Sequence, residues 1–129
     1  MLRMTAVAYA VAIAVHFADH LRRGLDASPD VVIALGVLAA LFQVAAVGAA
    51  LTGRSLAPVL AVAVGLPDAV GVFAVHLLPR WSALSDPFPG AGAVDVTALS
   101  WASAVAEIAT GLAFAYAGWV VLRSRRVAV

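Results

Sequence analysis

The chain alternates between four long apolar stretches and short segments of polar and turn-forming residues. A helix that crosses the hydrocarbon core of a bilayer needs about 20 predominantly apolar residues. Four stretches reach this length, at about residues 4–22, 29–51, 57–78 and 97–122. The pattern therefore predicts an all-α integral membrane protein, a single four-transmembrane-helix bundle over residues 1–129.

Turn-forming residues mark the ends of these spans. Ser28 is expected to be the N-cap of the second span, with Pro29 at its first helical position. Pro79 closes the third span, and the connecting segment 79–96 is rich in Pro, Gly, Ser and Asp. Within this segment we expect Asp86 to be only a turn residue.

Arg3 ahead of an apolar run, with an Ala12-Ile13-Ala14 triplet, is also seen in cleaved signal peptides. The apolar stretch continues to His16 and beyond, however. We therefore expect the first span to be a retained helix.

Composition supports the membrane assignment and excludes several function classes. Hydrophobic residues make up 64% of the chain and charged residues 12%, against about 25% charged in soluble domains. A net charge of +1 gives no clustered basic face, which argues against a nucleic-acid partner. The chain has no cysteine, so disulfides, thiolate metal sites and thiol redox chemistry are excluded.

The distribution of arginines predicts the orientation, because cytoplasmic loops are enriched in basic residues. One side carries five arginines and no acids: Arg3, Arg54, Arg123, Arg125 and Arg126. The other side carries three arginines together with four aspartates. This predicts an N-in/C-in bundle with segment 79–96 outside. All basic residues are Arg, which with the heavy Ala and Val usage indicates a GC-rich genome, and we expect a bacterial plasma membrane.

Seven polar side chains interrupt the apolar spans: His16, Asp19, His20, Gln43, Asp68, His76 and Glu107. A charged group at the bilayer centre costs at least about 2.5–3.5 kcal/mol, so such groups are rare and usually functional. Asp68 and Glu107 each lie about ten residues, or roughly 15 Å, from the outer ends of their helices. Both are expected near the midplane, either neutral or paired with a cation, with the histidines above them.

The polar residues also share helix faces. His16, Asp19 and His20 are spaced i, i+3, i+4 on the first span. A polar stripe that includes Ser103 and Glu107 runs along the fourth span. Pro67, directly before Asp68, removes a helix hydrogen bond, and such broken turns in membranes usually line a cavity. We therefore expect the polar faces to converge on an outward-opening pocket.

The leading hypothesis is an enzyme that performs acid–base chemistry on a lipophilic substrate without a cofactor, as an isomerase, cyclase or hydrolase. Asp68 and Glu107 would be the acid–base pair and His16 the residue that tunes them. The residues expected to bind substrate are Gln43, His76, Asp19, His20, Ser103 and Trp101.

Two other hypotheses about the function stay open. His16, His20 and His76 could bind a metal ion or haem, because His16 and His20 lie one helical turn apart. Buried acids also serve as proton relays, so the chain could be a proton-coupled carrier or an accessory subunit of a membrane complex. Small residues offer faces for a homo-oligomer: Gly36, Gly48, Gly65, Gly71 and Gly111. Asp19 and His20 could instead simply pair with Arg22 or Arg23 at the interface.

Overall fold

The computed structural model describes residues 1–90 and 93–127, and the regular secondary structure in this part of the chain is all helical. Its elements are, in order, α1 (Leu2–Arg23), the 3₁₀ turn η1 (Leu25–Ala27), α2 (Asp30–Leu51), α3 (Ala57–Val72), the π-helical turn η2 (Phe73–Leu77) and α4 (Ala98–Val127). With α3 and η2 taken as one continuous helix, four helices are long and apolar enough to cross a membrane. The predicted four-helix membrane fold is confirmed.

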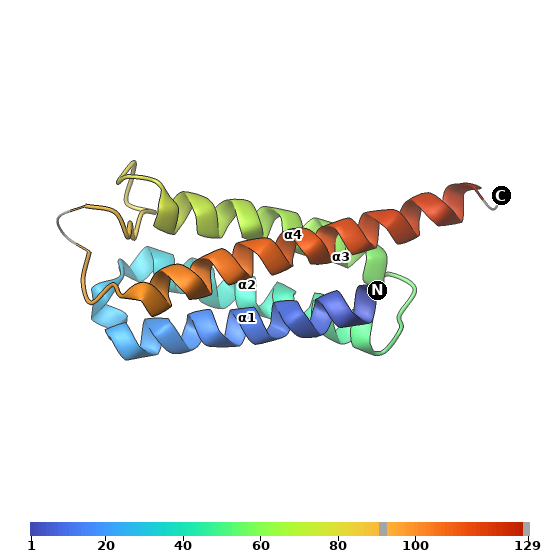
Figure 1. The fold of residues 1–129 in the computed structure, drawn as a ribbon, viewed down its shortest axis with the longest axis horizontal. Helices are drawn as coiled ribbons and strands as arrows, with labels where there is room; N and C mark the ends of the chain where they lie inside the picture. Colours follow the sequence, from blue (N-terminus) through green and yellow to red (C-terminus); the bar gives the residue numbers. More distant parts are fainter. Residues whose placement is uncertain (91–92, 128–129) are drawn as a thin grey trace.

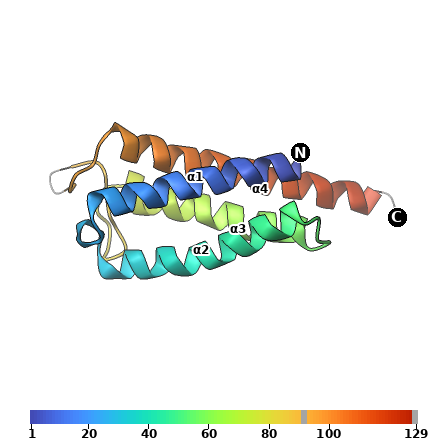
Figure 2. The same cartoon turned by 90° about the horizontal axis from the view of Figure 1, so that it is seen from below.

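The helices run side by side as an antiparallel bundle, with both chain termini at one end (Figure 1). The connection between α1 and α2 and the segment between η2 and α4 lie together at the opposite end. We call this end, which carries residues 24–29, 78–90 and 93–97, the loop end. Viewed from below, α2 lies along one edge of the bundle and α4 along the other (Figure 2).

Small residues bring α3 and α4 into close contact. A Cβ atom built on Gly65 would lie 2.6 Å from the carbonyl oxygen of Gly111, and one built on Gly118 would lie 2.6 Å from that of Pro58. Glycine is needed at these positions because the two backbones nearly touch, as is common between helices in lipid. Two of the glycines assigned above to an oligomer face, Gly65 and Gly111, therefore pack inside the bundle.

The core is small and lies toward the end that holds the termini. It consists of alanines around two fully buried rings, Tyr9 and Phe114, whose centroids are 5.4 Å apart. By contrast, large apolar side chains cover the outward faces of all four helices, for example Leu41 and Val44 on α2. This arrangement fits a protein whose outer surface is covered by lipid rather than water.

The structure corrects the predicted start of the second span. Ser28 is not the N-cap: α2 begins at Asp30, and its first turn starts from the carbonyl of Pro29, which accepts a hydrogen bond from the Val32 amide at 2.8 Å. Ser28 instead donates its hydroxyl hydrogen to Asp86, a partner in the distant loop. A tertiary contact has replaced the local cap.

The third and fourth spans also differ from their predicted course. The helix α3 continues through Pro67 and changes only later. After Val72 the third span changes from α-helix to the π-helical turn η2, which includes His76. A π turn holds more residues than an α turn, so it rotates the side chains that follow, and such turns often mark functional sites. His76, within this turn, is 3% exposed. In addition, α4 continues past Leu122 to Val127, so its basic residues lie on the helix.

Candidate functional site

Gln43 links the carboxyl groups of Asp68 and Glu107, which lie further from the loop end than the histidines. Its Nε2 amide donates to Oδ1 of Asp68 at 2.6 Å and to Oε1 of Glu107 at 3.2 Å. The hydroxyl of Tyr9 donates to the other oxygen of Asp68 at 2.7 Å. The Nδ1 atom of His16 lies 2.6 Å from the other oxygen of Glu107. All four helices thus contribute to one hydrogen-bonded network in which every carboxyl oxygen has a partner.

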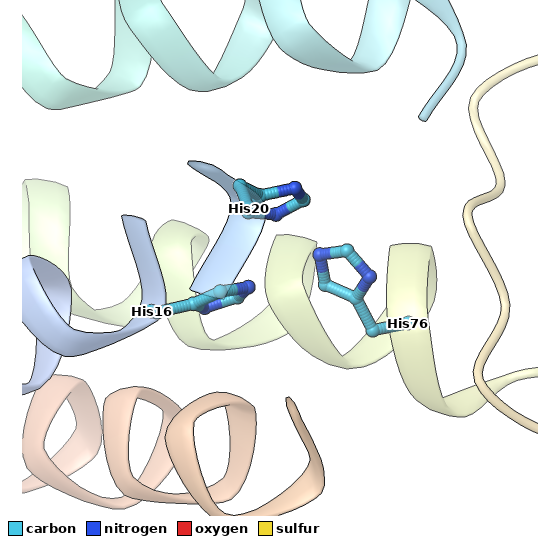
Figure 3. Close-up of side chains that lie close together, drawn as sticks. All are labelled: His16, His20 and His76. Carbon is cyan, nitrogen blue, oxygen red and sulfur yellow. The ribbon is translucent and has the colours of Figure 1, made fainter. Parts of the chain in front are cut away.

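The three histidines form a cluster between this network and the loop end. The ring centroids of His16 and His20 are 5.0 Å apart, as are those of His16 and His76, and those of His20 and His76 are 5.3 Å apart. One ring nitrogen from each histidine lies within 4.8 Å of the others. Figure 3 shows the three side chains turned toward one another from α1 and from η2. The sequence hypothesis that these three residues could share a ligand is therefore geometrically possible.

Each histidine has a partner at Nδ1. His16 faces the Glu107 carboxyl, and His76 donates to the backbone carbonyl of Asp86 at 3.0 Å. His20 lies 3.3 Å from Oγ of Ser28, whose own hydrogen is donated to Asp86 at 2.7 Å, so Ser28 accepts from His20. The carbonyl and the occupied hydroxyl require an N–H at Nδ1 of His76 and His20, and an ionised Glu107 carboxylate requires the same of His16. The hydrogen bonds therefore favour the same tautomer for all three rings, with the Nε2 lone pairs left over.

His16 Nε2 stands out among the buried polar side-chain atoms in the described part of the chain, because it alone has no hydrogen-bond partner. The His16 side chain is 6% exposed. A buried nitrogen without a partner costs about 1–3 kcal/mol, so native proteins rarely leave one. Because this atom belongs to the histidine cluster, its lone pair is available to a ligand.

A buried ion pair anchors the loop over the histidines. Arg23 makes two hydrogen bonds to the carboxylate of Asp86, at 2.8 and 3.0 Å, and its guanidinium also lies 5.3 Å from the ring centroid of Phe88. Burial alone would raise the pKa of Asp86, but the hydrogen bonds from Arg23 and Ser28 outweigh it and hold the pKa of this carboxyl below its usual range. Asp86 is thus part of the site and not only a turn residue, which corrects the expectation from sequence.

A cavity of about 1250 Å³ lies against both the carboxyl network and the histidine cluster. Its lining is mostly aliphatic and comes from α1, α2 and the third helix, with Glu107 of α4 and the loop-end residues Leu25, Trp81 and Leu84. The polar side chains in the lining are His16, His20, Gln43, Asp68, His76 and Glu107. Six of the polar residues singled out in the sequence therefore meet on one cavity wall.

Three other residues expected to bind substrate lie outside this lining. Asp19 is buried and pairs with Arg22 at 2.8 Å, the alternative kept open from sequence. The hydroxyl of Ser103 donates to the carbonyl of Ser100 at 2.9 Å, a bond within its own helix. Trp101 packs against Phe88 with ring centroids 5.6 Å apart. Their contacts support the loop end rather than the cavity.

Sequence reasoning did not single out Tyr9, and it gave Arg23 and Ser28 only interfacial or capping roles. Tyr9 lies seven residues before His16, so extending the polar face of α1 by two turns would have found it. Arg23 and Ser28 carry no comparable signal, because their partner Asp86 lies about 60 positions away in the chain.

The chain matches no known family model, no curated protein and no solved structure. Its function must therefore be inferred from the site itself.

Proposed function

We propose that this chain is a membrane-embedded enzyme that moves protons to and from a lipophilic substrate bound in the cavity. Asp68 and Glu107 act as the acid–base pair, and His16 sets the protonation of Glu107 through the bond between Nδ1 and Oε2. The reaction class is isomerisation, cyclisation or hydration, in which the acid adds a proton at one carbon centre and the base removes a proton from another carbon or, in hydration, from the attacking water. We further propose that the loop end faces outward from a bacterial plasma membrane.

The observation that carries this proposal is the amide of Gln43, which lies within 3.2 Å of both carboxyl groups on the wall of the cavity. Two carboxyls held by one donor exchange protons as a coupled pair, so one can serve as the acid while the other serves as the base. Gln43 supplies hydrogen bonds without a charge. It therefore orients the pair and leaves its proton content free to change.

The shape and lining of the cavity support a lipophilic substrate. Pockets for drug-sized ligands usually measure about 300–1,000 Å³, and this cavity, of about 1250 Å³, is larger. Aliphatic side chains such as Ile33, Val64 and Val72 dominate its lining, and its few polar side chains belong to the carboxyl network and the histidine cluster. A long hydrocarbon or isoprenoid chain with one reactive double bond or ring would match this division.

The test compares the lipophilic molecules of cells that express the wild type, Asp68→Asn, Glu107→Gln or the control Asp26→Asn, which changes an exposed carboxylate at the loop end. Mass spectrometry of solvent extracts should show a product that depends on the wild type and the control and falls at least tenfold in the two site variants. Equal product in Asp68→Asn and Glu107→Gln would contradict the acid–base assignment.

A proton-coupled carrier would use the same carboxyl groups differently. Reconstituted wild type would then acidify or alkalinise liposomes, and the flux would disappear in Asp68→Asn. Our proposal expects no such flux, because in the proposed reaction protons move only between the two carboxyl groups and the bound substrate.

A further inference from the structure

We infer that His16, His20 and His76 bind one divalent transition-metal ion through their Nε2 atoms, with a fourth coordination position open to the cavity. This inference does not rest on the proposed reaction, because metal binding can be measured without any substrate. It assigns a role to His20 and His76, which the proposed acid–base chemistry does not use, and a second role to His16.

The hydrogen bonds at Nδ1 give the first argument. Metal-bound histidines nearly always donate the other ring N–H to a carboxylate, a carbonyl or a similar acceptor, which fixes the ring and its tautomer. Here the three acceptors are the Glu107 carboxyl, the Asp86 backbone carbonyl and the Ser28 hydroxyl. The three acceptors come from three parts of the chain: α4, the segment between η2 and α4, and the connection between η1 and α2. All three rings are thereby left with an Nε2 lone pair that can bind a cation.

The unpartnered His16 Nε2 is the second, independent argument. It is buried, and no protein group satisfies it. A ring nitrogen without a hydrogen cannot donate to another such nitrogen, so the neighbouring histidines cannot satisfy His16 Nε2 while their own N–H groups are used at Nδ1. A cation bound between the three rings would accept a lone pair from one nitrogen of each histidine, and so satisfy His16 Nε2.

The distances suit a small ion. In tetrahedral zinc sites the Zn–N bonds are about 2.0–2.1 Å, which places the nitrogens roughly 3.3 Å apart. One ring nitrogen from each histidine lies within 4.8 Å of the others, so side-chain rotations that shorten these distances by about 1.5 Å would close the site. Haem fits less well, because it takes at most two axial ligands on opposite faces of the macrocycle. Here His16 and His20 stack at an interplanar angle of only 12°.

The composition of the ligand set indicates the chemistry of the ion. Imidazole nitrogens suit zinc, copper, nickel and iron, whereas magnesium and calcium prefer oxygen ligands. Three protein ligands with an open fourth position are typical of catalytic rather than structural zinc sites. The cavity touches all three histidines, so a water molecule or a polar group of the bound lipophile would take the fourth position.

Metal binding is tested on the full chain purified in detergent through a tag without histidine, since the three histidines are the only ones in the sequence. The protein is stripped with a chelator and titrated with Co²⁺. We expect one ion per chain with the intense visible bands of tetrahedral cobalt, and displacement of cobalt by Zn²⁺. The control Asp26→Asn should behave as the wild type, and His20→Ala and His76→Ala should lose the bands.

A further variant separates binding from folding. Ser28→Ala removes the acceptor for His20 Nδ1 and leaves all three ligands in place, so it should weaken cobalt affinity about 10-fold or more. X-ray absorption of the zinc-loaded wild type should show imidazole scattering, a result that holds even if the histidine variants fail to fold. A first shell of oxygen atoms only, or cobalt uptake that the histidine substitutions leave unchanged, would overturn the inference.

Discussion

Arg23 and Asp86 face each other through two hydrogen bonds of 2.8 and 3.0 Å, although 63 positions separate them in the chain. The side chains are 1% and 6% exposed. The pair fixes the loop to the end of α1, and it also places the Asp86 carbonyl against Nδ1 of His76. The anchor of the loop and the orientation of a candidate metal ligand are therefore the same structural feature.

Breaking this pair should destabilise the protein strongly. Asp86→Asn leaves the charge of Arg23 buried without its counter-ion, and loss of one partner of a buried pair typically costs about 3–5 kcal/mol. We expect a clear fall in the melting temperature, measured in detergent by circular dichroism. Asp26→Asn changes an exposed carboxylate near the same end and should have little effect. Similar melting temperatures for the two variants would show that the ion pair is not stabilising.

The same pair predicts how stability depends on pH. The pKa of Asp86 is lowered in the folded protein, so it binds a proton less readily there than in the unfolded chain, where the pKa is about 3.9. Its contribution is therefore present above about pH 4 and is lost as the pH falls through the lower folded value. The difference in melting temperature between wild type and Asp86→Asn should shrink from pH 7 to pH 3. A difference that stays constant would contradict the assigned direction.

Gln43 is expected to matter more than its lack of charge suggests. Gln43→Leu removes the N–H donors shared by Asp68 and Glu107 and leaves two buried carboxyls partly unsatisfied, at a cost of about 1–3 kcal/mol each. We expect a lower melting temperature and at least a tenfold loss of the wild-type-dependent product. Leu41→Ala, on the exposed face of the same helix, is the matched control and should retain the product. Full product formation by Gln43→Leu would remove Gln43 from the site.

The close contact between α3 and α4 gives a prediction about packing. A methyl group at Gly118 would lie 2.6 Å from the Pro58 carbonyl oxygen and 2.8 Å from the Ala61 side chain, so Gly118→Ala should cost about 1–3 kcal/mol. Gly48 has no neighbour within 4 Å, and Gly48→Ala should be neutral or stabilise by about 0.4–1 kcal/mol. Thermal unfolding of both variants measures the difference, and a reversed order would mean that the helices pack differently.

The number and length of the spans could be predicted because the bilayer imposes a minimum apolar length on any crossing helix. The inward position of His16, Gln43 and Glu107 could also be predicted, since each lies on the polar face of its helix. Helical periodicity is a local property, and it is retained in the folded bundle.

The rest depended on contacts between distant segments or on local irregularity. The π turn begins with the apolar residues Phe73-Ala74-Val75 before His76, a sequence that is equally compatible with a regular helix. Ser28 and Asp86 both have ordinary local roles, as a cap and as a turn residue, and only the folded loop shows that they bond to each other. Long-range pairing of common polar residues leaves no periodic signal in one sequence.

The membrane orientation gives the last prediction. The absence of cysteine allows single reporter cysteines to be introduced without a background signal. Ala83 lies exposed in the loop between η2 and α4, and Ser55 lies exposed in the connection between α2 and α3 at the opposite end of the bundle. If both termini are cytoplasmic, Ala83→Cys should react with a membrane-impermeant maleimide in intact cells, whereas Ser55→Cys should react only after permeabilisation. The opposite labelling pattern would reverse the orientation and place the histidine cluster on the cytoplasmic side, where intracellular metal ions would supply it.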